Sequence, residues 1–440
     1  IAIGNQALKG ESSGSKNIGI GYQSLKTITT GEQNVAVGYN TLTASTSGAA
    51  NVVLGYRAMY QGGGSQNIAI GADAMFQGPT GGTNYAIGRY SMMDCNAGST
   101  ALSSNSNIAF GHSALGGTWA DAASNFNTAI GHYSMDAGVN GALNNTALGY
   151  QSLSSLTTGD SNIAIGNISL RDVTSGGFNV AIGHQAGMQQ TTGSGSVNIG
   201  YLAGQVDSSS PNVIIGSGAF AASNTSDSGS NVILGYESGG SINHAGSEHN
   251  VILGRGAGVG GSGQFKRNVA IGSYAMDGTG SADVFGVVAI GYFAGTALGH
   301  AQVQGGTYVG YEAGKSNYSA GHTTAIGYQA LMSVTANGYN TAVGSMALNL
   351  ATGNSNTAVG AHTLSNVTTG HSNTAMGRQA GDAIVNGEQN SLFGFQSGTS
   401  LQIGRYNSAF GYQSLHSDQH GSYSTAIGYK ALYSQLHGTV

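Results

Sequence analysis

The sequence predicts an all-β fold, a parallel β-solenoid of about 25 coils, and two observations lead to this prediction. A five-residue motif that ends in glycine, such as Asn34 to Gly38, occurs 25 times between Gly4 and Gly428. Within the motif the apolar residues lie two apart, which is the period of a β-strand and not the 3.6-residue period of a helix. One short strand in every repeat is typical of a solenoid, whose coils stack on one another.

The spacing of the motif predicts the domain organisation. We call the last residue of each motif the marker glycine. Of the 24 intervals between marker glycines, 13 are seventeen residues long and 3 are sixteen, and the longest, from Gly88 to Gly111, is twenty-three. Because no interval has room for an inserted domain, we expect residues 1–440 to form a single continuous repeat domain, with longer irregular loops at 89–107 and 112–127.

Two positions of the motif are consistently apolar or β-branched. The residue before the marker glycine is apolar in all 25 copies, and the residue three before it is β-branched in 22. These two side chains lie on the same side of a strand, and the residue between them is usually alanine. We expect the residues before the marker to form the structural core column, which includes Ile20, Val37, Ile165, Ile182, Ile326, Val343, Val359 and Met376.

The size of the repeat predicts association of several chains. One coil buries about three side chains, worth about 1.5–3 kcal/mol each, whereas ordering it costs roughly 1.5 kcal/mol per residue. Coils stacked at about 4.8 Å would form a rod on the order of 120 Å long. Because the core of one chain would still be thin, we expect several chains to pool their apolar faces, with the isoleucine and valine columns near a shared axis.

The composition excludes several classes of protein. Only 7% of the residues are charged, against roughly a quarter in ordinary domains, and there are 76 glycines, 2 prolines and 1 cysteine. A hydrophobic content of 40% and the regular spacing argue against disorder. A net charge of −5 offers no basic patch, so we expect no nucleic-acid partner. No apolar run approaches about 18 residues, so we expect no membrane span.

The pentapeptides "NIAIG", "NVAVG", "NTAIG" and "NSAFG" resemble those of the YadA-type heads of trimeric autotransporter adhesins. The longer unit, with "GYQSL" or "GYQAL" followed by "TTG", is more similar to repeats in the shafts of bacteriophage tail fibres. The resemblance covers essentially the whole chain. It implies a left-handed parallel β-roll, an intertwined homotrimer and an extracellular location on a virion tail fibre or a cell-surface appendage. Since the sequence opens inside a motif, at Ile1 to Gly4, we expect it to be a fragment or a processed product.

The recurring polar and aromatic positions have two interpretations each. Asparagine stands four before the marker in 19 of 24 copies, and we favour a buried hydrogen-bonded ladder over a glycan-contact stripe. Tyrosine follows the marker in 11 copies, where stacked rings either pack on sugars or shield their own coils. The candidate recognition residues are therefore Tyr22, Tyr39, Tyr56, Tyr328, Tyr412 and Tyr429, together with Trp119, the only tryptophan, in an irregular loop.

Catalytic, metal and cofactor sites are not predicted. The acidic residues are scattered, no paired carboxylates recur, and no ordered set of serine, histidine and aspartate can be identified. The 12 histidines include no His-x-His pair, so we expect no metal site. The glycine-rich stretch from Gly258 to Gly263 lacks the strand, helix and lysine context of a phosphate loop. We expect a protein that is not an enzyme and has no cofactor.

These observations give three functional hypotheses. The first is a structural and adhesive fibre protein, the shaft of a phage tail fibre or similar appendage that presents a receptor-binding tip to a cell surface. The alternative is the head of a bacterial trimeric adhesin that binds host matrix or glycans. In either case the expected partners are two further copies of the chain and a cell-surface polysaccharide or protein receptor. A monomeric ice-binding solenoid is disfavoured, since only one threonine per coil recurs.

Overall fold

The computed structural model describes residues 1–95, 103–206, 211–221, 229–242, 244, 246–299, 302–316, 321–333 and 338–434. The chain divides into two compact units, Ile1–Ser217 and Gly218–Val440, and each unit is a parallel β-solenoid. No helix occurs among the described residues. The units contain about 23 turns, slightly fewer than the predicted 25 coils. The all-β solenoid is thus confirmed, and the single continuous domain stays a prediction.

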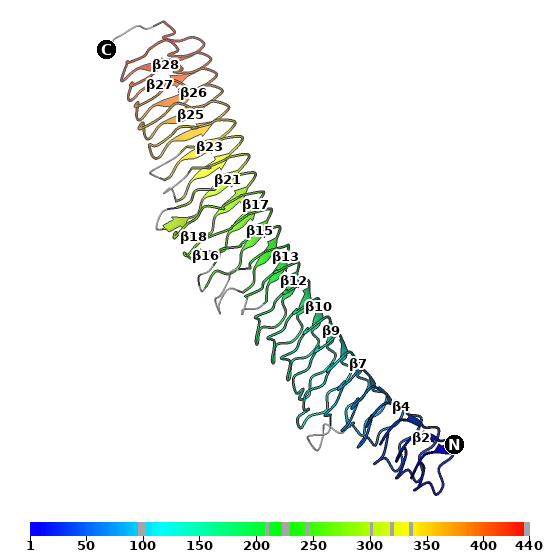
Figure 1. Ribbon diagram of the computed structural model, residues 1–440. Coiled ribbons are helices and arrows are strands. Elements are labelled where there is room, and N and C mark those ends of the chain that lie inside the picture. Colours follow the sequence, from blue (N-terminus) through cyan, green and yellow to red (C-terminus); the bar gives the residue numbers. More distant parts are fainter. Residues whose placement is uncertain are drawn as a thin grey trace. The chain divides into compact units, whose positions relative to one another are not determined.

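The first unit has one short strand per coil. Its strands are β1 (Ala2–Ile3), β2 (Ile18–Ile20), β3 (Val35–Val37), β4 (Val52–Leu54), β5 (Ile68–Ile70), β6 (Tyr85–Ile87), β7 (Ile108–Phe110), β8 (Thr128–Ile130), β9 (Thr146–Leu148), β10 (Ile163–Ile165), β11 (Val180–Ile182), β12 (Val197–Ile199) and β13 (Val213–Ile215). Successive strands pair in parallel and in register, so that Ala164 lies between Ala147 and Ala181 (Figure 1).

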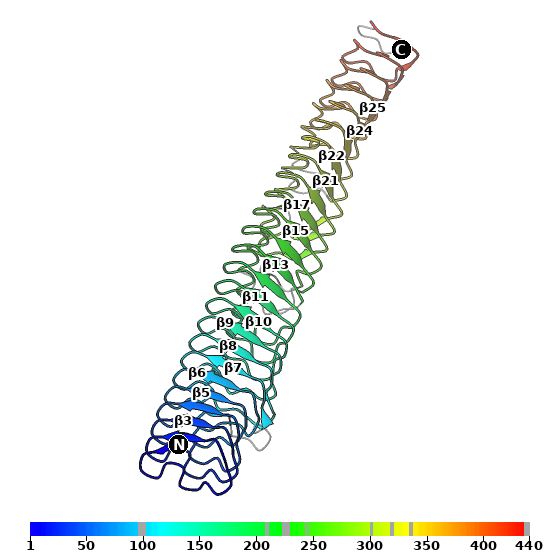
Figure 2. The same ribbon diagram turned by 90° about the vertical axis from the view of Figure 1, so that its right-hand side faces the viewer.

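The second unit repeats this arrangement and adds a small sheet. Its main sheet contains β14 (Val232–Leu234), β15 (Val251–Leu253), β17 (Val269–Ile271), β19 (Val288–Ile290), β21 (Thr307–Val309), β22 (Thr324–Ile326), β23 (Thr341–Val343), β24 (Thr357–Val359), β25 (Thr374–Met376), β26 (Ser391–Phe393), β27 (Ser408–Phe410) and β28 (Thr425–Ile427). The small parallel sheet consists of β16 (Phe265–Lys266), β18 (Asp283–Phe285) and β20 (Gln302–Gln304). Figure 2 shows the strands of the main sheet side by side.

The interior of each solenoid is lined by the middle residue of the strand. Ala36 and Ala164 are completely buried, and so are residues four after the marker glycine, such as Leu42 and Leu170. In these coils a small strand residue and a large residue of the following turn are buried together in the interior. We call the middle strand residues the inner column.

The predicted core column does not line this interior. Of the residues before the marker glycine, Ile20, Val37, Ile165, Val343 and Val359 are half-buried, whereas Ile182, Ile326 and Met376 are exposed. Alternate residues of a strand point to opposite sides, and the alanine side faces inward because it packs with the leucine of the following turn. Within one chain the column lies outside, and its packing at a shared axis stays a prediction.

The marker glycine is required by both backbone conformation and space. Gly38 has φ +137°, and a Cβ atom there would lie 2.2 Å from the carbonyl oxygen of Gly55 in the next coil. The residues two and four after it, Asn40 and Leu42, also have positive φ, 53° and 46°. Glycine adopts such conformations at no steric cost, which explains why it replaces leucine at the fourth position in several coils, as at Gly187.

The asparagine ladder is present and buried. Asn162 donates from its backbone N–H and from Nδ2 to Oδ1 of Asn145, at 2.9 and 3.0 Å, and from Nδ2 to the carbonyl oxygen of Gly176 at 2.9 Å. Asn179 repeats this pattern on Oδ1 of Asn162. Each amide thus satisfies a buried turn carbonyl and the next backbone N–H, as the ladder interpretation predicted.

Candidate functional surface and cavity

Each unit exposes apolar side chains on the outward side of its strands, interspersed with threonine and serine at the position three before the marker. We call the residues one and three before the marker glycine, on the outward side of each strand, the outer stripe. Phe110 is 53% exposed, Met376 49% and Leu148 43%. Because successive strands pair in register, these side chains lie next to one another from coil to coil. Contiguous exposed apolar surface of this kind marks an interaction surface.

The tyrosines after the marker glycine form ladders on the surface. All six tyrosines that the sequence singled out are exposed, namely Tyr22, Tyr39, Tyr56, Tyr328, Tyr412 and Tyr429. Within a ladder the rings stack face to face, with 5.1 Å between the centroids of Tyr22 and Tyr39 and 5.4 Å between those of Tyr39 and Tyr56. The ring faces therefore cover one another, and edges and hydroxyl groups remain for solvent. This geometry supports the shielding interpretation over sugar stacking.

Trp119 does not belong to the surface. Its side chain is completely buried, and the indole Nε1 donates to the carbonyl oxygen of Leu115 at 3.2 Å. The sequence suggested a protruding loop, but Thr118 pairs with Asp94 of the preceding coil and keeps this segment within the solenoid. The prediction that Trp119 is a surface recognition residue is therefore wrong. Residues 96–102 of the other irregular segment lie outside the described residues.

Cys95 is also buried. Burial raises the pKa of its thiol well above the ordinary value, and the charge of Asp94 raises it further. The thiol donates to the carbonyl oxygen of Met92 at 3.1 Å. A protonated, buried thiol is a poor nucleophile, so Cys95 fills the interior of its coil.

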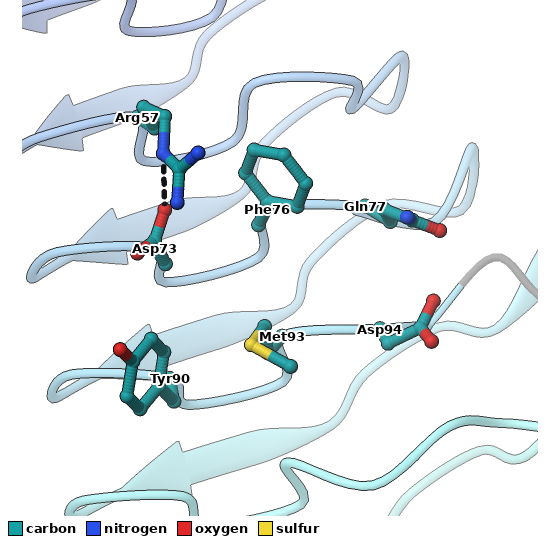
Figure 3. Close-up of a pocket in the computed structure, with 7 residues that line it drawn as sticks. All are labelled: Arg57, Asp73, Phe76, Gln77, Tyr90, Met93 and Asp94. Atoms are coloured by element: carbon teal, nitrogen blue, oxygen red, sulfur yellow. Dashed lines mark hydrogen bonds and ion pairs between the residues drawn. The ribbon is translucent and has the colours of Figure 1, made fainter.

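The first unit contains a cavity of about 220 Å³ that the sequence did not indicate (Figure 3). We call it the Arg57 cavity; it is lined by Arg57, Asp73, Phe76, Tyr90, Met93 and Asp94, with Gln77 beside Phe76. Nε of Arg57 donates to Oδ1 of Asp73 at 2.8 Å. Oδ1 of Asp94 is buried and has no hydrogen-bond partner in the described part of the chain. The lining comes from three successive coils, those that begin with β4, β5 and β6.

A signal for this cavity was present in the sequence. The position two after the marker glycine is often glutamine, as at Gln23 and Gln151, whereas two successive coils have Arg57 and Asp73 there. In a chain with 7% charged residues, opposite charges at the same position of neighbouring coils indicate a local departure from the repeat.

The second unit has a cavity of different character. Its volume is about 300 Å³, and His362, Ser365, Asn366 and Asp382 are among its lining residues. Ser365 donates its hydroxyl to Oδ1 of Asp382, and Nδ2 of Asn366 donates to the backbone carbonyl of Asp382 at 2.8 Å. The serine is thus bound to the carboxylate and not to His362, which is unlike the serine–histidine–aspartate arrangement of hydrolases.

No group of three or more histidine, cysteine, aspartate or glutamate side chains in the described part of the chain is arranged to hold a metal ion. None of the described residues form a helix long and apolar enough to cross a membrane. Comparison with known proteins gave no match, whether to a family model, to a curated protein or to a solved structure.

Proposed function

We propose that this chain is the shaft of an extracellular fibre, such as a phage tail fibre, in which three copies associate along their outer stripes. The observation that supports this proposal most is the outer stripe itself. Exposed Phe110, Leu148 and Met376 are larger than the alanines of the inner column, so one chain leaves some of its bulky apolar side chains in water. Burying a side chain of this size is worth about 1.5–3 kcal/mol. Association of chains would recover this free energy.

The number three comes from the resemblance to trimeric β-roll repeats, while the stripe supports association in general. Repetition suits a shaft, because stacked coils with in-register strands and runs of asparagine ladder resist bending and local opening. Surface charge is sparse, so steering of a charged ligand along the shaft is weak. The second candidate, a trimeric adhesin head, rests on the same stripe and the same repeats.

Antibodies against the recombinant chain test the fibre proposal. Immunogold electron microscopy of virus particles and of bacterial cells from the source should label filaments that project from the virion. Labelling of a bacterial outer surface and not of virions would favour the adhesin head. Labelling confined to the cell interior would overturn both. Pre-incubation with the same antibodies should reduce adsorption of the virus to its host cells.

A further inference from the structure

We propose that the Arg57 cavity binds a single neutral sugar ring of a cell-surface glycan. The inference goes beyond the fibre proposal, because all lining residues belong to the first unit of one chain and the site does not depend on trimer formation.

The layout of the cavity matches the two kinds of surface on a pyranose. Figure 3 shows Phe76 and Met93 between two polar sides, with Arg57 and Asp73 on one side and Asp94 on the other. A pyranose ring has apolar C–H faces and a rim of hydroxyl groups that both donate and accept hydrogen bonds. Small-molecule sites commonly combine an apolar lining with a few placed polar groups.

The cationic side of the cavity is ordered before any ligand binds. The Arg57 guanidinium lies over the rings of Phe76 and Tyr56, 4.8 and 4.9 Å from their centroids, and Nε is fixed by Asp73. Among the described residues, the Nη groups of Arg57 and Oδ2 of Asp73 make no hydrogen bond, so the Nη donors and one carboxylate acceptor remain for ligand hydroxyls. A rigid site loses little conformational entropy on binding.

The opposite side provides an unsatisfied acceptor. Oδ1 of Asp94 is buried without a hydrogen-bond partner among the described residues, a state that is costly unless a further group donates to it. Asp94 lines the cavity, so a sugar hydroxyl can donate to its carboxylate while another accepts from Arg57. Two carboxylates and one guanidinium leave a net charge of −1, which disfavours sialic acid, uronic acids and phosphate groups.

The volume of the cavity and the number of metal-binding side chains restrict the class of bound ligand further. A volume of 220 Å³ lies below the about 300–1,000 Å³ of sites for drug-sized ligands, so the cavity has room for one ring. A metal ion is disfavoured, because the described residues contain no group of three metal-binding side chains.

Saturation-transfer difference NMR on the full chain tests this inference. The probes are the methyl glycosides of glucose, galactose, mannose, fucose and N-acetylglucosamine, with N-acetylneuraminic acid as the acidic comparison. At least one neutral glycoside should receive saturation from the wild-type protein. The variants D73N and D94A should weaken its affinity about tenfold or more.

The matched control is D172N. Asp172 forms a comparable pair with Arg171, at 2.6 Å, away from the cavity, so this variant should bind like the wild type. Thermal unfolding of each variant shows whether it is folded, and Q77A provides a further substitution at the cavity if D94A unfolds. No transfer to any neutral glycoside, transfer only to N-acetylneuraminic acid, or affinity unchanged in folded D73N and D94A would each overturn the proposal.

Discussion

The two sides of the same short strand differ in a way that an isolated solenoid does not require. In β10 the inward residue is Ala164, which is completely buried, whereas the outward Ile163 is 39% exposed. The larger side chain thus lies outside and the smaller one inside. A soluble monomer gains most by the reverse arrangement. The difference teaches that folding of the single chain leaves these outward apolar residues exposed, and their burial between chains is what the fibre proposal predicts.

The largest effect is expected from a charge in the inner column. A164D would place a carboxylate among Ala147, Ala181 and the leucines of the interior, where no cation can pair with it. An uncompensated buried charge costs about 3–5 kcal/mol. Hydrogen exchange should increase in the coils next to β10, and the melting temperature should fall. Unchanged exchange there would show that the inner column is not the interior.

A smaller loss is expected from the asparagine ladder. N162A removes the two bonds that the amide Nδ2 donates and leaves the backbone N–H of Asn179 without its acceptor. Lost hydrogen bonds and one unsatisfied buried donor together cost about 2–4 kcal/mol. Urea denaturation followed by circular dichroism should show this change. The matched control is N354A, in a polar turn, and an equal loss in both variants would contradict the ladder's role.

A gain in stability is expected where the inner column is polar. Asn198 occupies the alanine position in β12 and is completely buried, and no described residue forms a hydrogen bond with its Nδ2 or Oδ1. N198V removes this unsatisfied amide at nearly equal volume, so the free energy of unfolding should rise by about 1 kcal/mol. A lower melting temperature for N198V would indicate that the amide has a partner, such as a buried water molecule.

The smallest effect on the coil itself is expected in the outer stripe. I165D changes a half-buried outward residue, so in dissociated chains the free energy of coil unfolding should change by less than about 0.5 kcal/mol. Association should nevertheless be lost, because the same carboxylate would be buried unpaired between chains. The far-UV circular dichroism spectrum should keep its β-sheet form. Loss of that form would place Ile165 in the interior of the single chain.

Much of the fold could be predicted from the sequence because the same residue types recur at equivalent positions of successive coils. The strand positions, the parallel register and the asparagine ladder all follow from columns that recur every coil. Which side of each strand faces the interior could not be predicted in this way, because alternation defines two sides and does not distinguish them. The structure answers this question, because the leucine at the fourth position after the marker, such as Leu42, is buried on the same side as the middle strand residue.

The candidate sites were harder to predict. Trp119 was interpreted as protruding because its segment interrupts the repeat, yet its backbone N–H donates to Asp94 at 2.9 Å and joins the stack. The Arg57 cavity depends on side chains from three coils, so no single repeat contains it. Only departures from a column, such as Arg57 and Asp73 in place of glutamine, indicated that this part of the surface differs.

The mass of the assembly in solution tests the central claim most directly, namely that the outer stripe is an interface between chains. Multi-angle light scattering after size exclusion should give three times the 44.0 kDa mass of the chain for the wild type and 44.0 kDa for I165D. A wild-type mass of 44.0 kDa across the accessible concentration range would contradict the claim.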